Sequence, residues 1–152
     1  MFTHILLPTD GSPLSRAAMH KGLQFAKSIH AKVTGFHAIQ PFHVFTLQTK
    51  VLEETKEQFE KEARAHAEQC LAVMKQAADE AGVVCDTTYV TTDHPYEAII
   101  QAAEEKGCDL IMMASHGRRG MRGLLIGSET QKVLTHTKIP EPLAKVHVAR
   151  CI

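Results

Sequence analysis

Short runs rich in apolar and β-branched residues alternate along the chain with longer stretches in which apolar residues recur every three or four positions. The runs are typical of buried strands and cover residues 4–7, 33–39, 83–90, 110–113 and 145–149. The longer stretches are typical of amphipathic helices and cover residues 13–30, 52–81, 95–107 and 129–137. This alternation of strand and helix predicts an α/β fold, in which a parallel sheet has helices on both faces.

Residues that stop or start regular structure lie at the predicted boundaries. Pro8 follows the first run, and proline lacks the backbone donor that a continuing strand would need. Ser12 and Pro13 are an N-cap residue and a proline at the first helical position. Gly82 follows the second helical stretch, and Pro140 follows the last one. These residues support the predicted division into strands and helices.

Two parts of the pattern need separate interpretation. Residues 41–49 carry apolar side chains without a clear period, so they form either a loop that covers a site or a surface for a partner. His66 lies on the apolar stripe of the second helical stretch. We interpret it as a histidine packed at the margin of the core rather than as a metal ligand.

The composition is that of an ordinary globular domain. With 152 residues the chain can form one domain with a sizeable core, so we expect a single domain over residues 1–152. Lysine plus arginine equals aspartate plus glutamate at 17 each, so no overall charge attracts nucleic acid or an anionic membrane. No apolar run approaches the ~20 residues of a membrane span, and Thr3 and His4 interrupt the start before a signal peptide develops. We therefore expect a cytoplasmic protein without a nucleic-acid or membrane partner.

The cysteines and histidines do not follow a metal-binding pattern. The ten histidines include no HExxH motif, and no cysteine belongs to a CxxC pair. A dedicated zinc site is therefore not expected. Reduced and mostly buried thiols are expected at Cys70, Cys85, Cys108 and Cys151.

Residues 114–128 carry the clearest chemistry. They follow the run 110–113 directly and contain four glycines and three arginines. Glycines let backbone N–H groups converge without Cβ obstruction, and a helix that begins near Gly127 and Ser128 directs its positive end into the same space. Such a loop suits phosphate, although a glycine-rich segment can also serve as a mobile crossover. The rival motifs GxxxxGK[ST], and GxGxxG after the first strand, are absent.

These residues resemble the nucleotide loop of the universal stress protein family. In the ATP-binding branch of that family the loop reads Gly, two residues, Gly, nine residues, Gly and then Ser or Thr. The present chain matches it with Ser115-His116-Gly117, nine residues, and Gly127-Ser128. The resemblance extends along most of the chain, with further matches at Pro8-Thr9-Asp10, His37-Ala38-Ile39 and residues 109–113. Ala114 departs from the motif, because it stands where the first glycine should be.

The resemblance implies a five-stranded, doubly wound, Rossmann-like parallel sheet with strand order 3-2-1-4-5. The ligand crevice then lies where the order reverses, between the carboxyl ends of the first and fourth strands. ATP is expected to bind the backbone N–H groups of the loop, with the hydroxyls of Ser128 and Thr130 donating to phosphate oxygens. The predicted nucleotide contacts are Pro8, Thr9, Asp10, Ala38, Met113, Ala114, Ser115, His116, Gly117, Arg118, Gly127, Ser128, Glu129 and Thr130.

Three positions carry more specific expectations. Asp10 accepts a ribose hydroxyl or holds Mg²⁺ or Mn²⁺ beside the phosphates, and it can also serve as a turn residue before the first helix. Arg118 either pairs with terminal phosphates or remains solvated. If the backbone at Ala114 has a positive φ or closely approaches phosphate, an Ala114→Gly variant should bind ATP more tightly.

Three functions are compatible with these features. The first is an ATP-binding stress or signalling module, in which the nucleotide controls the conformation or the partner surface of a homodimer. The second is a slow ATP hydrolase, for which the sequence identifies no residue that positions water. The third is a nucleotide-free interaction protein of the same fold. A homodimer is implied by the family, which pairs its last edge strand between subunits, although residues 140–149 depart from the family's usual ending.

Overall fold

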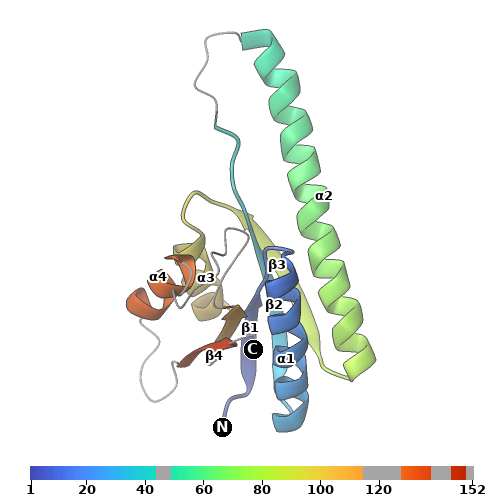
Figure 1. Ribbon diagram of the computed structural model, residues 1–152, viewed down its shortest axis with the longest axis vertical. Helices are drawn as coiled ribbons and strands as arrows, with labels where there is room; N and C mark the ends of the chain where they lie inside the picture. Colours follow the sequence, from blue (N-terminus) through green and yellow to red (C-terminus); the bar gives the residue numbers. More distant parts are fainter. Residues whose placement is uncertain (44–48, 115–127, 138–144, 150–152) are drawn as a thin grey trace.

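Five strands and four helices alternate along the part of the chain that the structure describes. The computed structural model describes residues 1–43, 49–114, 128–137 and 145–149 (Figure 1). The strands are β1 His4–Pro8, β2 Lys32–Ile39, β3 Cys85–Thr91, β4 Leu110–Ala114 and β5 Lys145–Ala149. The helices are α1 Pro13–Ile29, α2 Thr49–Ala81, α3 Pro95–Glu105 and α4 Ser128–His136.

All neighbouring strands of the sheet run parallel. Their order is β3-β2-β1-β4-β5. The chain leaves β1 toward β2 on one side and later returns to β4 on the other, so the strand order reverses at β1. Because β1 and β4 pair in parallel, their carboxyl ends lie at the same edge of the sheet. The predicted α/β class with a parallel sheet is confirmed.

Each face of the sheet has its own hydrophobic core. Side chains alternate along β1, so Ile5 and Leu7 pack with residues of α1 and α2, whereas Leu6 packs with residues of α3 and α4. All three side chains are at most 1% exposed. Figure 1 shows the same arrangement, with α1 and α2 on one side of the sheet and α3 and α4 on the other. Burial on both faces explains why the inner strands read as continuous apolar runs.

The helix boundaries follow the local signals in the sequence. Ser12 caps α1, because its hydroxyl oxygen accepts a hydrogen bond from the Ser15 backbone N–H at 3.2 Å. After α2, Gly82 adopts a φ of 73°, and the Val83 N–H still donates to the Ala78 carbonyl at 2.9 Å. Val83, which was expected to start the third strand, is therefore part of the turn that ends α2. The strand therefore begins at Cys85 rather than at residue 83.

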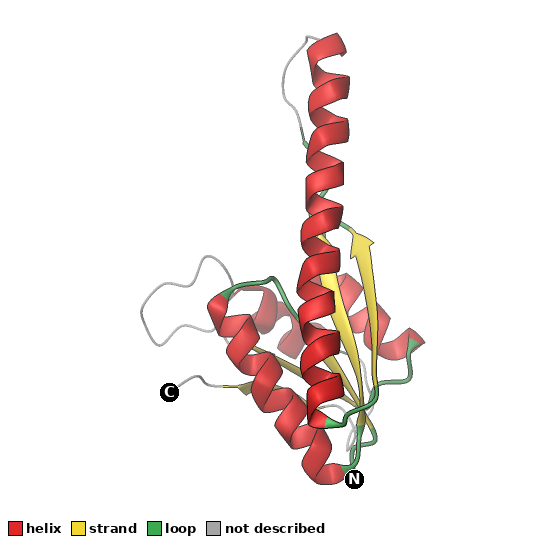
Figure 2. Cartoon of the chain, turned by 90° about the vertical axis from the view of Figure 1, so that its right-hand side faces the viewer, coloured by secondary structure: helices red, strands yellow, loops and turns green. Residues whose placement is uncertain are grey.

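α2 is long and extends beyond the sheet (Figures 1 and 2). Its 33 residues span roughly 50 Å at 1.5 Å per residue. Residues 55–62 are all exposed, whereas Ala67, Leu71, Met74 and Ala78 are buried against the sheet. The helix begins at Thr49, inside the segment 41–49 for which no regular structure was expected, and residues 44–48 lie outside the described part. No helix in the described part, α2 included, is long and apolar enough to cross a membrane.

Polar contacts close the amino-terminal edge of the sheet. The Asp109 carboxylate accepts hydrogen bonds from Thr3 N and Oγ1, each at 2.8 Å, and from His4 N at 2.9 Å. Burial raises the pKa of Asp109, but these hydrogen bonds outweigh it and hold that pKa below its usual range. The His4 ring is buried, and its Nε2 lies 2.8 Å from Thr34 Oγ1. Burial lowers the pKa of this imidazole, with a further contribution from Lys32.

The cysteines in the described part are free thiols. Cys85 and Cys108 are buried, and Cys70 is partly buried. Burial raises the pKa of the Cys85 thiol, and it raises that of Cys108 to about 11. The expectation of reduced, mostly buried thiols is confirmed for these three residues, and Cys151 lies outside the described part.

Candidate functional site

The loop after β1 is fixed by hydrogen bonds of its own residues. The Thr9 N–H donates to the Phe36 carbonyl of β2 at 2.8 Å, which holds the end of β1 in place. Asp10 Oδ1 accepts a hydrogen bond from the Ser12 N–H at 2.9 Å, forming an Asx turn that leads into α1. Thr9 Oγ1 accepts from the Gly11 N–H at 3.2 Å. The turn role considered for Asp10 is present, and its half-buried side chain lies at the carboxyl edge of the sheet.

α2 packs directly against this loop at Gly11. Gly11 has a φ of 77°, and a Cβ at this position would lie 2.7 Å from Cys70 Sγ and 3.1 Å from His66 Nε2. His66 Nε2 is 3.5 Å from Cys70 Sγ, and the His66 ring meets the buried His37 ring edge-on with centroids 5.7 Å apart. His66 is therefore a packing residue, as interpreted from the sequence. Sequence reasoning did not place Cys70 or His37 at this loop, although the spacing of four residues between His66 and Cys70 puts both on one face of α2.

A hydrogen bond joins β4 and α4, the two elements on either side of the segment 115–127. Thr130 Oγ1, in the first turn of α4, donates to the carbonyl oxygen of Ala114 at the end of β4 at 3.0 Å. Thr130 is 3% exposed. A hydroxyl group has a single proton, so Thr130 uses its proton to attach α4 to β4, and the structure does not present it to a phosphate. Ser128 is the exposed first residue of α4.

Ala114 is an ordinary strand residue. It closes β4 and is 8% exposed. His30 is the one non-glycine residue of the described part with a positive φ, so Ala114 does not have one. The positive φ that was one possible reason for tighter binding by an Ala114→Gly variant is therefore absent. Strain relief therefore gives no reason for an Ala114→Gly variant to bind ATP more tightly.

Glu129 contacts α3 rather than the loop after β1. Its Oε2 accepts a hydrogen bond from the Tyr96 backbone N–H at 3.1 Å, and its Oε1 accepts one from Lys132 Nζ at 2.9 Å. Tyr96 also lies under Lys132, whose Nζ is 5.4 Å from the ring centroid. The hydrogen bond from the Tyr96 hydroxyl to Glu97 raises the pKa of that hydroxyl. These contacts give Glu129 two partners within the protein.

The remaining predicted contacts divide into two groups. Pro8, Ala38 and Met113 lie at or near the carboxyl ends of β1, β2 and β4, and Pro8 and Ala38 are partly exposed. The structure therefore brings them to the same edge of the sheet as Thr9 and Asp10. The other group lies outside the described residues and comprises Ser115, His116, Gly117, Arg118 and Gly127.

The described residues do not form a metal site by themselves. Across these residues, no group of three or more histidine, cysteine, aspartate or glutamate side chains could hold a metal ion. Mg²⁺ usually takes one or two carboxylates and completes its shell with water and substrate phosphates. The Asp10 carboxylate is a hard oxygen donor of that kind, so it fits a cation that is shared with a nucleotide.

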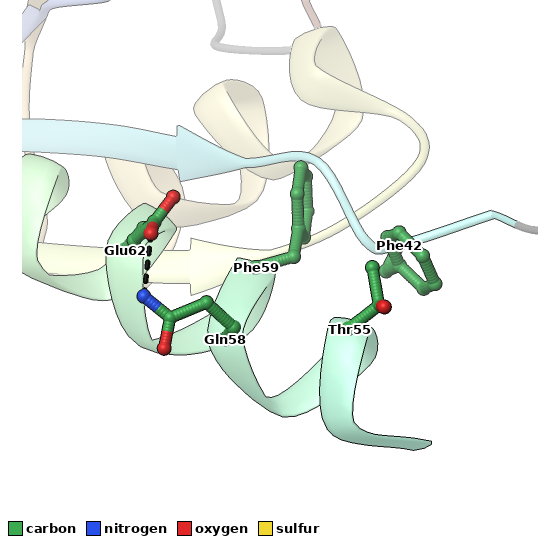
Figure 3. A pocket seen from close by; sticks show the side chains of 5 residues that line it. All are labelled: Phe42, Thr55, Gln58, Phe59 and Glu62. Atoms are coloured by element: carbon green, nitrogen blue, oxygen red, sulfur yellow. Dashed lines mark hydrogen bonds between the residues drawn. The ribbon is translucent and has the colours of Figure 1, made fainter. Parts of the chain in front are cut away.

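A separate pocket lies between α2 and the chain that follows β2 (Figure 3). It is lined by Phe42, Thr55, Gln58, Phe59 and Glu62. The Phe42 and Phe59 ring centroids are 5.1 Å apart, and Gln58 Nε2 donates to Glu62 Oε1 at 2.5 Å. No predicted nucleotide contact lines this pocket. The aromatic pair attaches the beginning of the segment 41–49 to α2.

The chain has a doubly wound parallel sheet, and α4 begins after β4, beside the point where the strand order reverses. In open α/β sheets generally, this edge is where ligands bind. Comparison with known proteins gives the family. The family model described as "Universal stress protein family" matches residues 1–141, and the chain belongs to that family.

Individual relatives support this assignment. Universal stress protein YxiE of Bacillus subtilis is 30% identical over 137 residues, which cover 88% of this chain and 92% of YxiE. The solved structure of MJ0577 from Methanocaldococcus jannaschii superposes with a TM-score of 0.75 at 25% identity, covering 100% of this chain and 99% of that one. A universal stress protein solved in complex with cAMP superposes with a TM-score of 0.67 at 24% identity, covering 96% and 97% of the two chains. The family resemblance found in the sequence is therefore confirmed.

Proposed function

We propose that this protein is an ATP-binding module of a stress or signalling response, in which the nucleotide controls conformation or partner binding. The observation that carries the proposal is the hydrogen bond between Thr130 and Ala114. It holds both ends of the segment with the family's nucleotide-loop pattern at the edge where β1 and β4 end. Family membership and the cAMP held by one structural relative support an adenine nucleotide as the ligand.

The chain's own residues have distinct roles in this proposal. Backbone N–H groups of the glycine-rich segment and of the first turn of α4 bind the phosphates, and Ser128 donates its hydroxyl. Asp10 holds Mg²⁺ or Mn²⁺ beside the phosphates, and Ala38 lies near the purine. Thr130 fixes the start of α4 rather than contacting the ligand.

The assembly and setting of the protein are part of the same proposal. Residues 1–152 form one nucleotide-binding domain that acts in the cytoplasm as a homodimer paired through the edge strand β5. β5 is the last strand of the sheet, and an edge strand is the place where a second copy could pair with it.

A nucleotide-free interaction protein of the same fold is the alternative that a specific observation favours. Ala114 replaces the first glycine of the ATP-binding motif, and its methyl group is largely buried at the end of β4. If the backbone of the family approaches phosphate at this point, the methyl group obstructs the approach. This alternative predicts a folded protein that binds no ATP.

Calorimetric titration with ATP, with and without Mg²⁺, distinguishes the two functions. We expect saturable binding that is strengthened by Mg²⁺ in the wild-type protein, and a smaller Mg²⁺ effect in Asp10→Asn. Gly127→Ala should weaken binding because a Cβ obstructs the converging N–H groups. Gly107→Ala is the matched control, since Gly107 lies before β4, at the opposite edge of the sheet. Wild-type protein that binds no ATP, and releases no nucleotide on denaturation, would establish the alternative instead.

A further inference from the structure

The amino terminus of α3 is capped by a side chain from α4. His94 occupies the N-cap position of α3 without a side-chain capping hydrogen bond, and Pro95 has no N–H to donate. Tyr96 therefore supplies the first backbone N–H of the helix, and the Glu129 carboxylate accepts it. A carboxylate is favourable there because the amino terminus of a helix carries partial positive charge, and a charge-assisted bond is stronger than a neutral one.

This contact and a second one fix the first turn of α4 from two directions. Glu129 joins the turn to α3, across 33 residues of sequence. The next residue, Thr130, joins it to the carbonyl oxygen of Ala114. Both anchors lie within two residues of Ser128, where α4 begins. These two hydrogen bonds hold the first turn of α4 at the carboxyl edge of the sheet, while Val133, one turn further on, anchors the helix in the core.

We propose that Glu129 is a positioning residue, which holds the first turn of α4 ready for the nucleotide and couples occupancy of the site to α3. This inference rests on the proposed function, because it assigns the regulation of the same site. If formation of the bond from Glu129 to Tyr96 raises ATP affinity by ordering the turn, then bound ATP must raise the equilibrium constant for forming that bond by the same factor. Binding of ATP therefore strengthens the hydrogen bond at the amino terminus of α3.

Tyr96 provides a local reporter for this coupling. Its ring lies below Lys132 and 5.2 Å, centroid to centroid, from the ring of His136, so it lies between α3 and α4. The chain has two tyrosines and no tryptophan. In a Tyr89→Phe background, Tyr96 is consequently the single source of tyrosine fluorescence, and Tyr89 lies on the separate strand β3.

The test uses the full chain with two substitutions at Glu129 and one control. Glu129→Ala removes the acceptor, and Glu129→Gln keeps an acceptor without the charge. Glu97→Ala is the control, because the Glu97 carboxylate bonds the Tyr96 hydroxyl but not its backbone N–H. We expect ATP affinity to fall about fivefold or more in Glu129→Ala, a typical size for coupling between sites. Glu129→Gln should recover part of that loss, and Glu97→Ala should bind like the wild type.

Hydrogen exchange at the Tyr96 amide measures the effect of bound ATP on the hydrogen bond between Glu129 and Tyr96. Without nucleotide, exchange should be faster in Glu129→Ala than in the wild type. ATP should slow this exchange and change Tyr96 fluorescence in the wild type, and both responses should be lost in Glu129→Ala. Wild-type protein that binds no ATP would overturn the proposed function together with this inference. Wild-type and Glu129→Ala proteins that bind ATP equally well would overturn the inference alone.

Discussion

Gly11 links the loop that carries Asp10 to the packing of α2. Its φ of 77° lies in the left-handed region, and a Cβ would stand 2.7 Å from Cys70 Sγ. Gly82 has a similar φ of 73°, but a Cβ added there would have no neighbouring atom within 4 Å. Substituting alanine at Gly82 therefore tests backbone strain alone, whereas the same substitution at Gly11 tests strain together with steric overlap.

We predict that Gly11→Ala destabilises the protein more than Gly82→Ala does. A left-handed conformation costs an alanine about 1–2 kcal/mol at either position. Overpacking against Cys70 and His66 adds about 1–3 kcal/mol at Gly11 alone. Urea denaturation of both variants measures the difference in the free energy of unfolding. Equal losses would show that the Cys70 and His66 side chains move aside without cost.

Local signals explain which site residues the sequence could predict. The turn at Asp10 and the cap at Ser12 depend on partners two or three residues away, so the sequence contains all the information they need. The partner of Glu129 is Tyr96, which no local pattern connects to it. The role of Thr130 also could not be predicted, because its acceptor is a carbonyl group on another element.

α2 combines a packed half and a solvated half in one continuous helix. Toward the carboxyl end, Ala67, Leu71, Met74 and Ala78 are fully or nearly fully buried at the interface with the sheet. Residues 55–62 contribute no buried side chain, and the Phe59 ring contacts Phe42 rather than the sheet. A short helical segment that does not pack against the sheet, such as residues 55–62, is only marginally stable in water. Packing against the sheet therefore decides the local stability along α2.

We predict that amides of residues 55–62 exchange with solvent much faster than those of residues 71–78. The Phe42 contact should retain some protection, so Phe59→Ala should speed exchange in the solvated half. Val73→Ala is the control, because Val73 is similarly exposed on the packed half. Neither variant should change global stability by more than about 0.5 kcal/mol, as is usual for exposed positions. Equal protection along α2, measured by hydrogen exchange with mass spectrometry, would contradict the division into two halves.

The strands were predictable because each is a short apolar run, and several of these runs are flanked by clear breakers such as Pro8 and Gly82. The start of α2 was placed three residues late, at residue 52 instead of Thr49, because the residues between Pro41 and Thr49 have no apolar period. The sequence therefore predicted most of α2, including its exposed residues 55–62, but not its first turn.

At the scale of the whole molecule, the two edges of the sheet have different roles. The carboxyl edge gathers Thr9, Asp10, Ala114 and the first turn of α4, which form the candidate site. The amino edge is closed by Asp109 and by the buried His4, whose contacts connect β1, β2 and the start of β4. The amino edge therefore contributes to stability, and its titratable groups make that stability depend on pH.

We predict that His4 makes the protein less stable below about pH 6.5, the usual pKa of an unfolded histidine. Burial lowers the pKa of the folded His4, so between the folded and unfolded values the unfolded chain binds more protons. Stability is consequently full above the unfolded pKa and is lost as the pH falls through the folded pKa. His4→Gln removes the titrating ring and should flatten this part of the profile. Free energies of unfolding measured at intervals from about pH 7.5 to about pH 5 test the prediction.

The choice of control and pH range isolates His4 from other groups. His20→Gln replaces an exposed histidine of α1 and should leave the wild-type slope unchanged. Asp109, whose pKa is below its usual range, contributes stability that is present above the unfolded value of about 3.9 and is lost only in stronger acid. The chosen pH interval therefore excludes most of its effect. The same slope in His4→Gln and in the wild type would mean that the buried imidazole does not govern the acid sensitivity, and that other groups must carry it.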